Sequence, residues 1–152
     1  MTFVVDGTNG LTFPNSTTQA SASKVLQVVN AIFTTITSTT SSSFVTTGFS
    51  ASITPSSTSS KVFIILNATA YTPATQNAYY TIYRGGTNLG GATYGLLGIG
   101  TPGVYTPVPI TFLDSPATTS STTYTVYFKA SGTNQFNDNG ITASLTLQEI
   151  AA

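Results

Sequence analysis

The sequence predicts an all-β protein: an antiparallel β-sandwich of about eight strands, jelly-roll or TNF-like, with an extended N-terminal arm. Strand-favouring residues dominate the 152-residue chain, and 31 of its residues are threonine. Turn residues recur at short intervals, and no segment after residue 30 has a helical pattern. Strands without crossover helices bury their apolar faces by closing two sheets on each other. An immunoglobulin-like sandwich is the alternative, although the chain lacks the Cys and Trp of that core.

Residues 1–23 are predicted to form an arm for attachment or assembly, and residues 24–152 the sandwich domain. Two short apolar pieces of the arm are separated by the turn-forming residues 6–10, and the polar residues 16–23 lead into the first strand. The apolar pieces have too little surface for a core of their own, so we expect them to contact another chain. The side chains concerned are Phe3, Val5, Leu11 and Phe13.

Strands are expected wherever β-favouring residues lie between turn signals. In the last of them, apolar Ile141, Ala143, Leu145 and Leu147 alternate with polar residues, which predicts a strand buried on one face. The expected strands are 25–38, 44–54, 62–71, 78–84, 93–97, 108–114, 122–130 and 141–150.

The connections are predicted from glycine, proline, serine and asparagine. Residues 55–60 and 115–121 are Ser/Thr-rich turns with a proline near the start, and residues 137–140 (NDNG) favour a hairpin turn. Residues 85–91 indicate a hairpin with several positive φ angles, and residues 95–109 a long flexible loop where recognition residues could lie.

The scarcity of reactive groups predicts that the protein is not an enzyme and uses no cofactor. It has four cationic and four acidic side chains, no histidine and no cysteine, whereas catalysis and metal binding draw mainly on those types. The net charge is zero and the cations are scattered, so the chain lacks the clustered positive charge that binds nucleic acid. The longest apolar run, residues 62–66, is too short for membrane insertion. A neutral, charge-poor surface favours association, so we expect an oligomer.

The remaining motifs have structural interpretations. Residues 85–91 lack the Lys-Ser/Thr ending of a phosphate-binding loop, and residues 137–140 hold too few carboxylates for calcium. We expect Asp114 to cap the turn at residues 115–116, and Glu149 to pair with a lysine on a neighbouring strand. A glycosidase pair of carboxylates is the less favoured alternative.

Tyrosines provide the candidate recognition surface, because aromatic rings with polar ends are enriched at interfaces and sugar-binding faces. Alternation places Tyr79 and Tyr83 on one face of their strand, and Tyr80, Ile82 and Arg84 on the other, so one group is expected to be core. The candidates for surface recognition are Tyr79, Tyr80, Tyr83, Arg84, Tyr94 and Tyr105.

Nearly the whole chain resembles the β-rich adhesive and decoration domains of tailed bacteriophages. The arm segment GLTFPNSTTQ (10–19) is similar to a phrase of phage fibre and virion surface proteins, with Ser16 where glycine is usual. Further similar phrases are ITPSSTSSKV (53–62), YTIYRGGTNLG (80–90), FLDSPATT (112–119) and LTLQEI (145–150). The resemblance implies a homotrimer at a fibre end or on a capsid surface, without known catalytic residues.

Two virion roles, and one cellular role, are therefore expected. The first is a trimeric decoration protein that cements the capsid, with its arm on the major capsid protein or another virion protein and its sandwich on the outer surface. Chain length favours it, because a tail fibre needs room for a shaft. The second is a tail-fibre or short-fibre tip that adsorbs to a host-surface glycan or protein. A cellular carbohydrate-binding domain ranks last, since it leaves the arm motif to coincidence.

Overall fold

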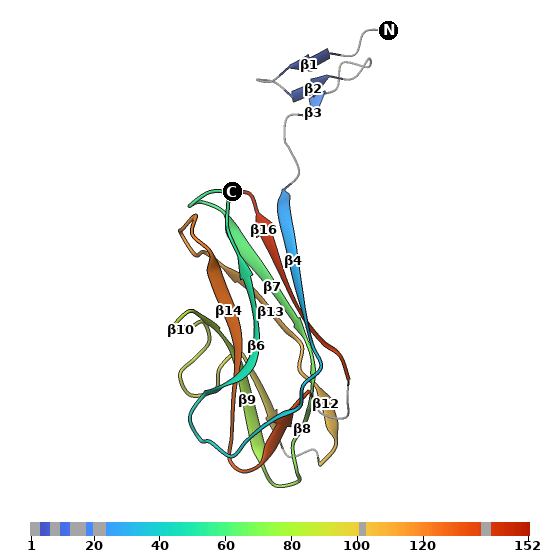
Figure 1. Cartoon of the computed structure of the whole chain (residues 1–152), viewed down its shortest axis with the longest axis vertical. Helices are drawn as coiled ribbons and strands as arrows, with labels where there is room; N and C mark the ends of the chain where they lie inside the picture. Colours follow the sequence, from blue (N-terminus) through green and yellow to red (C-terminus); the bar gives the residue numbers. More distant parts are fainter. Residues whose placement is uncertain (1–3, 7–9, 13–17, 20–23, 101–102, 138–140) are drawn as a thin grey trace.

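The structure is a computed structural model that describes residues 4–6, 10–12, 18–19, 24–100, 103–137 and 141–152, with only the backbone of residues 4–19. In the N-terminal segment, β1 (Val4–Asp6), β2 (Gly10–Thr12) and β3 (Thr18–Gln19) form an antiparallel sheet of their own (Figure 1). The expected extended arm therefore contains a small sheet, in which Val5 lies opposite Leu11. Phe3 and Phe13 lie outside the described residues.

Every regular element in the described residues is a strand, which confirms the all-β prediction. After the arm the strands are β4 (Val25–Phe33), β5 (Thr37–Thr39), β6 (Val45–Ile53), β7 (Lys61–Asn67), β8 (Thr69–Tyr71), β9 (Asn77–Arg84), β10 (Thr87–Asn88), β11 (Leu97–Gly100), β12 (Tyr105–Pro107), β13 (Ile110–Asp114), β14 (Thr122–Ala130), β15 (Asn134–Phe136) and β16 (Ala143–Ile150).

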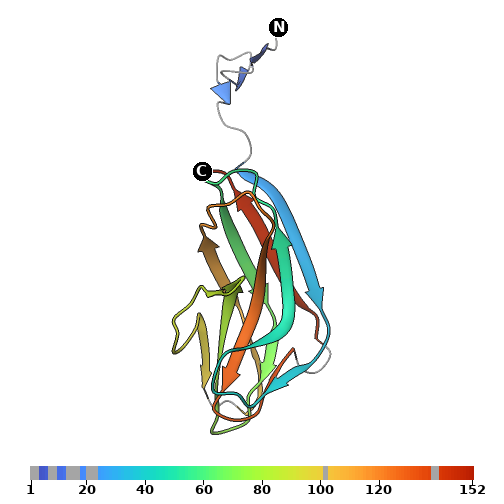
Figure 2. The ribbon, with the colours of Figure 1, turned by 60° about the vertical axis from the view of Figure 1, so that its left-hand side comes forward.

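The strands form a two-layered jelly roll (Figures 1 and 2). The sheets β13-β7-β16-β4 and β12-β8-β15-β5 have the same strand order. This is because β4 continues into β5, β7 into β8, β12 into β13 and β15 into β16, each after a short break. The opposing layer is β10-β9-β14-β6, with β11 also on β9. The sandwich can be counted as eight long strands in chain order: β4–β5, β6, β7–β8, β9, β10, β12–β13, β14 and β15–β16. In this numbering the two layers have the orders 1-8-3-6 and 2-7-4-5. This is the eight-stranded jelly roll of two Greek keys, and not the immunoglobulin alternative.

Alternating side chains build the core between the layers. Along β16, Ala143, Leu145 and Leu147 are fully buried while the intervening polar residues are half-buried, as predicted. Ile141, which was expected on the same buried face, precedes the strand and is 41% exposed. Aromatic rings pack together in the core: the Phe33 and Phe49 centroids lie 4.9 Å apart.

Several predicted connections differ from the structure. The expected strand 25–38 is interrupted between β4 and β5, and the short strand expected at 93–97 lies at β11 instead. The loop expected over 95–109 contains β11 and β12. Residues 137–140 do not join a hairpin, because β15 and β16 belong to different sheets; Asn137 has a φ of 58°, and residues 138–140 lie outside the described residues.

The hairpin after β9 is confirmed by the pairing of β9 with β10, but Gly85 alone among residues 85–91 has the positive φ that was expected of several. Gly85 and Gly95, which lies in the following loop, provide a test of packing. Gly85 and Gly95 both have positive φ, but a Cβ on Gly85 would meet nothing within 4 Å, whereas one on Gly95 would lie 2.5 Å from the Tyr80 carbonyl oxygen. Both alanine variants should lose about 1 kcal/mol to backbone strain, and Gly95→Ala about 1–3 kcal/mol more to overpacking. Urea unfolding measures both; equal losses would contradict the close contact.

Candidate functional site

An aromatic cluster with one lysine lies on the outer face of the sheet β10-β9-β14-β6. Tyr79 on β9 is in register with Lys129 on β14, so both side chains point away from the core. The Lys129 Nζ lies 4.9 Å from the Phe44 ring centroid and 5.6 Å from that of Tyr79. The Tyr94 ring lies 5.3 Å from the Tyr79 ring. The amine is therefore held among aromatic rings, an arrangement that favours a fixed cation.

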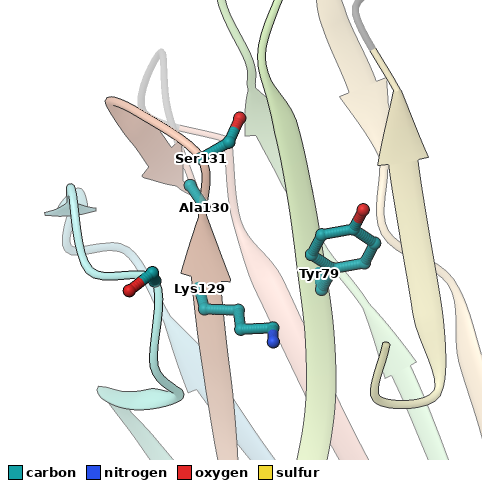
Figure 3. A pocket seen from close by; sticks show the side chains of 5 residues that line it. Tyr79, Lys129, Ala130 and Ser131 are labelled. Atoms are coloured by element: carbon teal, nitrogen blue, oxygen red, sulfur yellow. The ribbon is translucent and has the colours of Figure 1, made fainter. Parts of the chain in front are cut away.

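The cluster borders an open pocket of about 140 Å³. Figure 3 shows Tyr79 and Lys129 pointing into it from neighbouring strands, with Ser131 at the end of β14. Ser131 Oγ already accepts a hydrogen bond from the Asn77 backbone N–H at 2.9 Å, and its hydroxyl hydrogen is still available to a ligand. The pocket is lined by Ser42, Tyr79, Lys129, Ala130 and Ser131.

The loop after β10 shapes one side of this surface. Thr81, which alternation places between Tyr79 and Tyr83 on the outer face, is fully buried because residues 88–96 fold over it. Its hydroxyl donates to Asn88 Oδ1 at 2.6 Å. Beyond this cover the Tyr83 ring stacks on Tyr127, with 3.9 Å between centroids. The outer aromatic groups therefore form two separate clusters on one sheet.

Of the six predicted recognition residues, the structure brings Tyr79 and Tyr94 together and places Tyr83 farther along the same face. Tyr80 was wrongly expected on the surface: it is fully buried, and its hydroxyl donates to Asn134 Oδ1 at 2.6 Å. Tyr105 lies apart, on β12, with its ring 5.3 Å from that of Tyr71.

Arg84 belongs to a polar network inside the sandwich. Its guanidinium donates to both oxygens of Asp114 at 2.9 Å, and the Tyr124 hydroxyl donates to the same carboxylate at 2.7 Å. Burial, reinforced by the hydrogen bond to Asp114, raises the pKa of Tyr124 well above its usual range, so the hydroxyl stays a donor. The expected capping role of Asp114 is wrong, because its carboxylate serves this network.

Glu149 makes a second buried network, and the expected lysine pair is wrong. Its side chain is fully buried and accepts hydrogen bonds from the Ser56 backbone N–H and hydroxyl, at 2.7 and 2.6 Å, and from Gln27 Nε2 at 2.7 Å. Burial raises its pKa, but the hydrogen bonds from Ser56, Gln27 and Ser60 outweigh burial and lower the pKa to about 2. This carboxylate stays ionised and pins the loop after β6.

These networks leave neither described carboxylate of the sandwich positioned for acid–base chemistry. Asp114 and Glu149 flank Val62 in the register of β13, β7 and β16, both turned toward the core. General acid catalysis needs a carboxyl group with a raised pKa and access to substrate, whereas Glu149 has a lowered pKa and is fully buried. Within the described residues there is no group of three metal-ligating side chains, and no helix long and apolar enough to span a bilayer.

A second candidate surface is the outer face of the sheet β13-β7-β16-β4. Its central row runs across all four strands as Leu113, Phe63, Gln148 and Val28. Val28 is 57% exposed, Ile32 beside it 58% and Leu113 49%, so much apolar area faces outward. The face, which we call the apolar face, consists of Leu26, Val28, Asn30, Ile32, Phe63, Ile65, Thr111, Leu113, Ser144, Thr146 and Gln148. None of these is charged, and the exposed Lys61 lies on the same side of the sheet at the start of β7.

The edge strand of that face lacks the usual protection against pairing with another chain. Proteins guard edges with charges, prolines, bulges or very short strands. Among the described edges, β10 has two residues, the chain before β13 carries Pro107 and Pro109, and the pairing of β6 with β14 contains a register shift. The nine residues of β4 contain neither charge nor proline, and the register shift in the pairing with β16 lies at one end, so that Gln27 to Phe33 form a regular edge. An edge of this kind accepts another strand.

Sequence reasoning missed Phe44, Tyr127 and Lys129 as members of the aromatic clusters. The signal was present for two of them, since Tyr127 and Lys129 alternate with buried Val126 and Phe128 and so must lie on the outer face. Phe44 comes from the preceding loop, and only the fold brings it to Lys129.

Comparisons with known proteins find similarity among solved structures alone. No protein-family model and no curated protein sequence matches the chain. The chain is similar to VP2 of infectious bursal disease virus in a subviral particle, with 14% identity and a TM-score of 0.41 over 89% of this chain and 39% of VP2. A mutant VP2 in derived T=1 particles gives 14% identity and a TM-score of 0.40 over 89% and 38%. The chain thus spans less than half the length of these proteins.

Proposed function

We propose that this chain is a non-enzymatic structural protein of a virion, and specifically a homotrimeric decoration protein on the outer surface of a tailed-phage capsid. The observation that carries the proposal is the apolar face with its unguarded edge strand β4. Exposed apolar surface of this kind marks an interaction site. The phage-like phrases in the sequence add to this support.

The occupant of the apolar face is a second copy of the chain. The residues of the face carry no charge that a partner of opposite charge would neutralise, and a neighbouring copy is itself poor in charge. In a trimer each copy presents the face to a different surface of the next copy, and these contacts close into a ring. The hydroxyl and amide groups of the face, such as those of Thr146 and Gln148, donate and accept alike and so can pair with the hydroxyl-rich surface of a neighbouring copy. The sandwich is then the part that self-associates, and the arm is free to contact the major capsid protein or another virion protein.

Measuring the mass of the protein in solution tests this proposal. The wild-type chain should have three times the 15.7 kDa of one chain. Val28→Lys places a charge on the edge strand of the apolar face and should give a monomer, because lysine at an edge strand blocks pairing. Ser50→Lys adds the same charge to the exposed outer side of β6, in the other sheet, and should leave the trimer intact. A wild-type monomer would refute the proposal.

A receptor-binding tip of a tail fibre or short fibre is the second candidate, and the aromatic pocket around Tyr79 and Lys129 favours it. Labelled antibody on intact virions separates the two. Label over the whole shell means decoration, and label only at the tail means a fibre. Inhibition of phage adsorption by the purified protein would likewise support the fibre role against the capsid role.

A further inference from the structure

The pocket beside Tyr79 combines three features that together specify a ligand. The first is the aromatic ring of Tyr79, which lines the pocket and is half-buried against the exposed Tyr94. The second is the Lys129 amine, which forms no ion pair with any described residue. The third is a pair of exposed serines, Ser42 and Ser131, on the pocket wall.

Each feature matches one part of a carboxylated sugar. The C–H face of a pyranose ring is apolar and stacks on aromatic rings, while its hydroxyls need donors and acceptors such as serine and tyrosine hydroxyls. The sugar carboxylate needs a cation, and an ammonium group is a point charge that binds an oxygen anion without demanding a planar partner. A neutral sugar would leave the Lys129 charge unused, and a simple anion would leave the rings uncovered.

The position of the lysine argues for a prepared site. Lysine ordinarily extends into water as a flexible chain, and ordering it costs conformational entropy. Here the Phe44 and Tyr79 rings hold the amine within 4.9 and 5.6 Å of their centroids, so much of that cost is met before a ligand arrives. The two rings lie on different elements, β9 and the chain before β6, and the fold therefore fixes the charge at the pocket.

We infer that the pocket lined by Ser42, Tyr79, Lys129 and Ser131 is a binding site for a carboxylated sugar, with Lys129 binding the carboxylate and Tyr79, supported from behind by Tyr94, covering the ring. The site gives the protein a saccharide-binding activity beyond its proposed structural role. It lies on the opposite layer from the apolar face, so the sandwich can use both surfaces at once.

Chemical-shift titration of the ¹⁵N-labelled chain tests the site with defined probes. D-glucuronate and N-acetylneuraminate represent two sources of the carboxylated sugar, D-glucose the neutral ring, and acetate the anion alone. We expect saturable shifts at the amides of Tyr79, Lys129 and Ser131 with at least one acidic sugar, and binding about tenfold weaker for D-glucose. Whichever acidic sugar binds more tightly identifies the source. Absence of saturable shifts with both, or equal affinity for D-glucose or acetate, would overturn the inference.

Two variants separate the charge from the rings. Lys129→Gln keeps the side chain long but uncharged, and should weaken acidic-sugar binding about tenfold while leaving D-glucose unchanged. Tyr79→Ser should weaken both sugars, and its amide dispersion reports whether it is folded. Lys61→Gln, on β7 of the other sheet, is the matched control and should bind as wild type. Unchanged glucuronate and neuraminate affinity in Lys129→Gln would overturn the assignment. The trimer measurement is independent, so either proposal can fail alone.

Discussion

Replacing Asp114 by alanine is expected to lower the free energy of unfolding by about 3–5 kcal/mol, the range for removing one partner of a buried ion pair. The Asp114 side chain is 8% exposed and accepts from the Arg84 guanidinium and the Tyr124 hydroxyl. Its loss leaves a partly buried cation and a buried hydroxyl without their acceptor. Urea denaturation at neutral pH, followed by tyrosine fluorescence, measures the loss.

Milder variants of the same network serve as controls. Asp114→Asn keeps an acceptor oxygen in the same place and should lose less than Asp114→Ala. Tyr124→Phe removes only the hydroxyl and should cost about 1–2 kcal/mol. Combining Arg84→Met with Asp114→Ala should cost less than the sum of the single losses, because the unpaired charge is gone. Additive losses would contradict the coupling of the two side chains.

The free energy of unfolding is expected to fall as the pH is lowered from about 4.5 to 2, because Glu149 becomes protonated there. Its folded-state pKa, about 2, lies below the ordinary 4.5, so the unfolded chain takes up this proton more readily than the folded one. The stabilisation is complete above about pH 4.5 and is lost as the pH falls from there toward 2. The midpoint of urea unfolding, measured at intervals from pH 6 to pH 2, should fall steeply across this window.

The variant Glu149→Gln separates this carboxylate from the others that titrate in acid. It should be less stable than wild type at neutral pH by about 2 kcal/mol, because hydrogen bonds to a charged acceptor are replaced by weaker ones. Its stability should also depend less on pH between 4.5 and 2. Ser56→Ala removes one donor and should shift the acid midpoint upward. Parallel pH profiles for wild type and Glu149→Gln would rule out the assigned role.

Local pattern predicted the strands well where one face is buried and the other is not. The alternation in β14 and β16 fixes which residues enter the core, because side chains of a strand point to opposite faces in turn. Short strands such as β10, β12 and β15 were missed or merged into loops. With two or three residues each they have too little alternation to detect. Only the fold brings them beside their partners, which are β9 for β10 and the equally short β8 for β12 and β15.

The candidate site was predictable only in part, for the same reason. The tyrosines of β9 and their two faces follow from alternation, but the aromatic cage around Lys129 combines β9, β14 and two loops. The partners of Asp114 and Glu149 also come from distant parts of the chain, as with Ser56 and Glu149, which are 93 residues apart. For Glu149 the sequence favoured a lysine on a neighbouring strand, whereas the buried carboxylate is bound by hydroxyl, amide and backbone donors.

The pairing of β4 with β16 has a consequence for the order of folding. These strands are the first and last of the sandwich, and Thr146 bonds Asn30 across a sequence separation of 116 residues. During synthesis the sheet that contains β4 cannot close until β16 has left the ribosome, and contacts of such long separation form slowly. Until then β4 and β7 each lack β16 along one edge, and the nascent chain exposes these two edges to a chaperone or a sister chain.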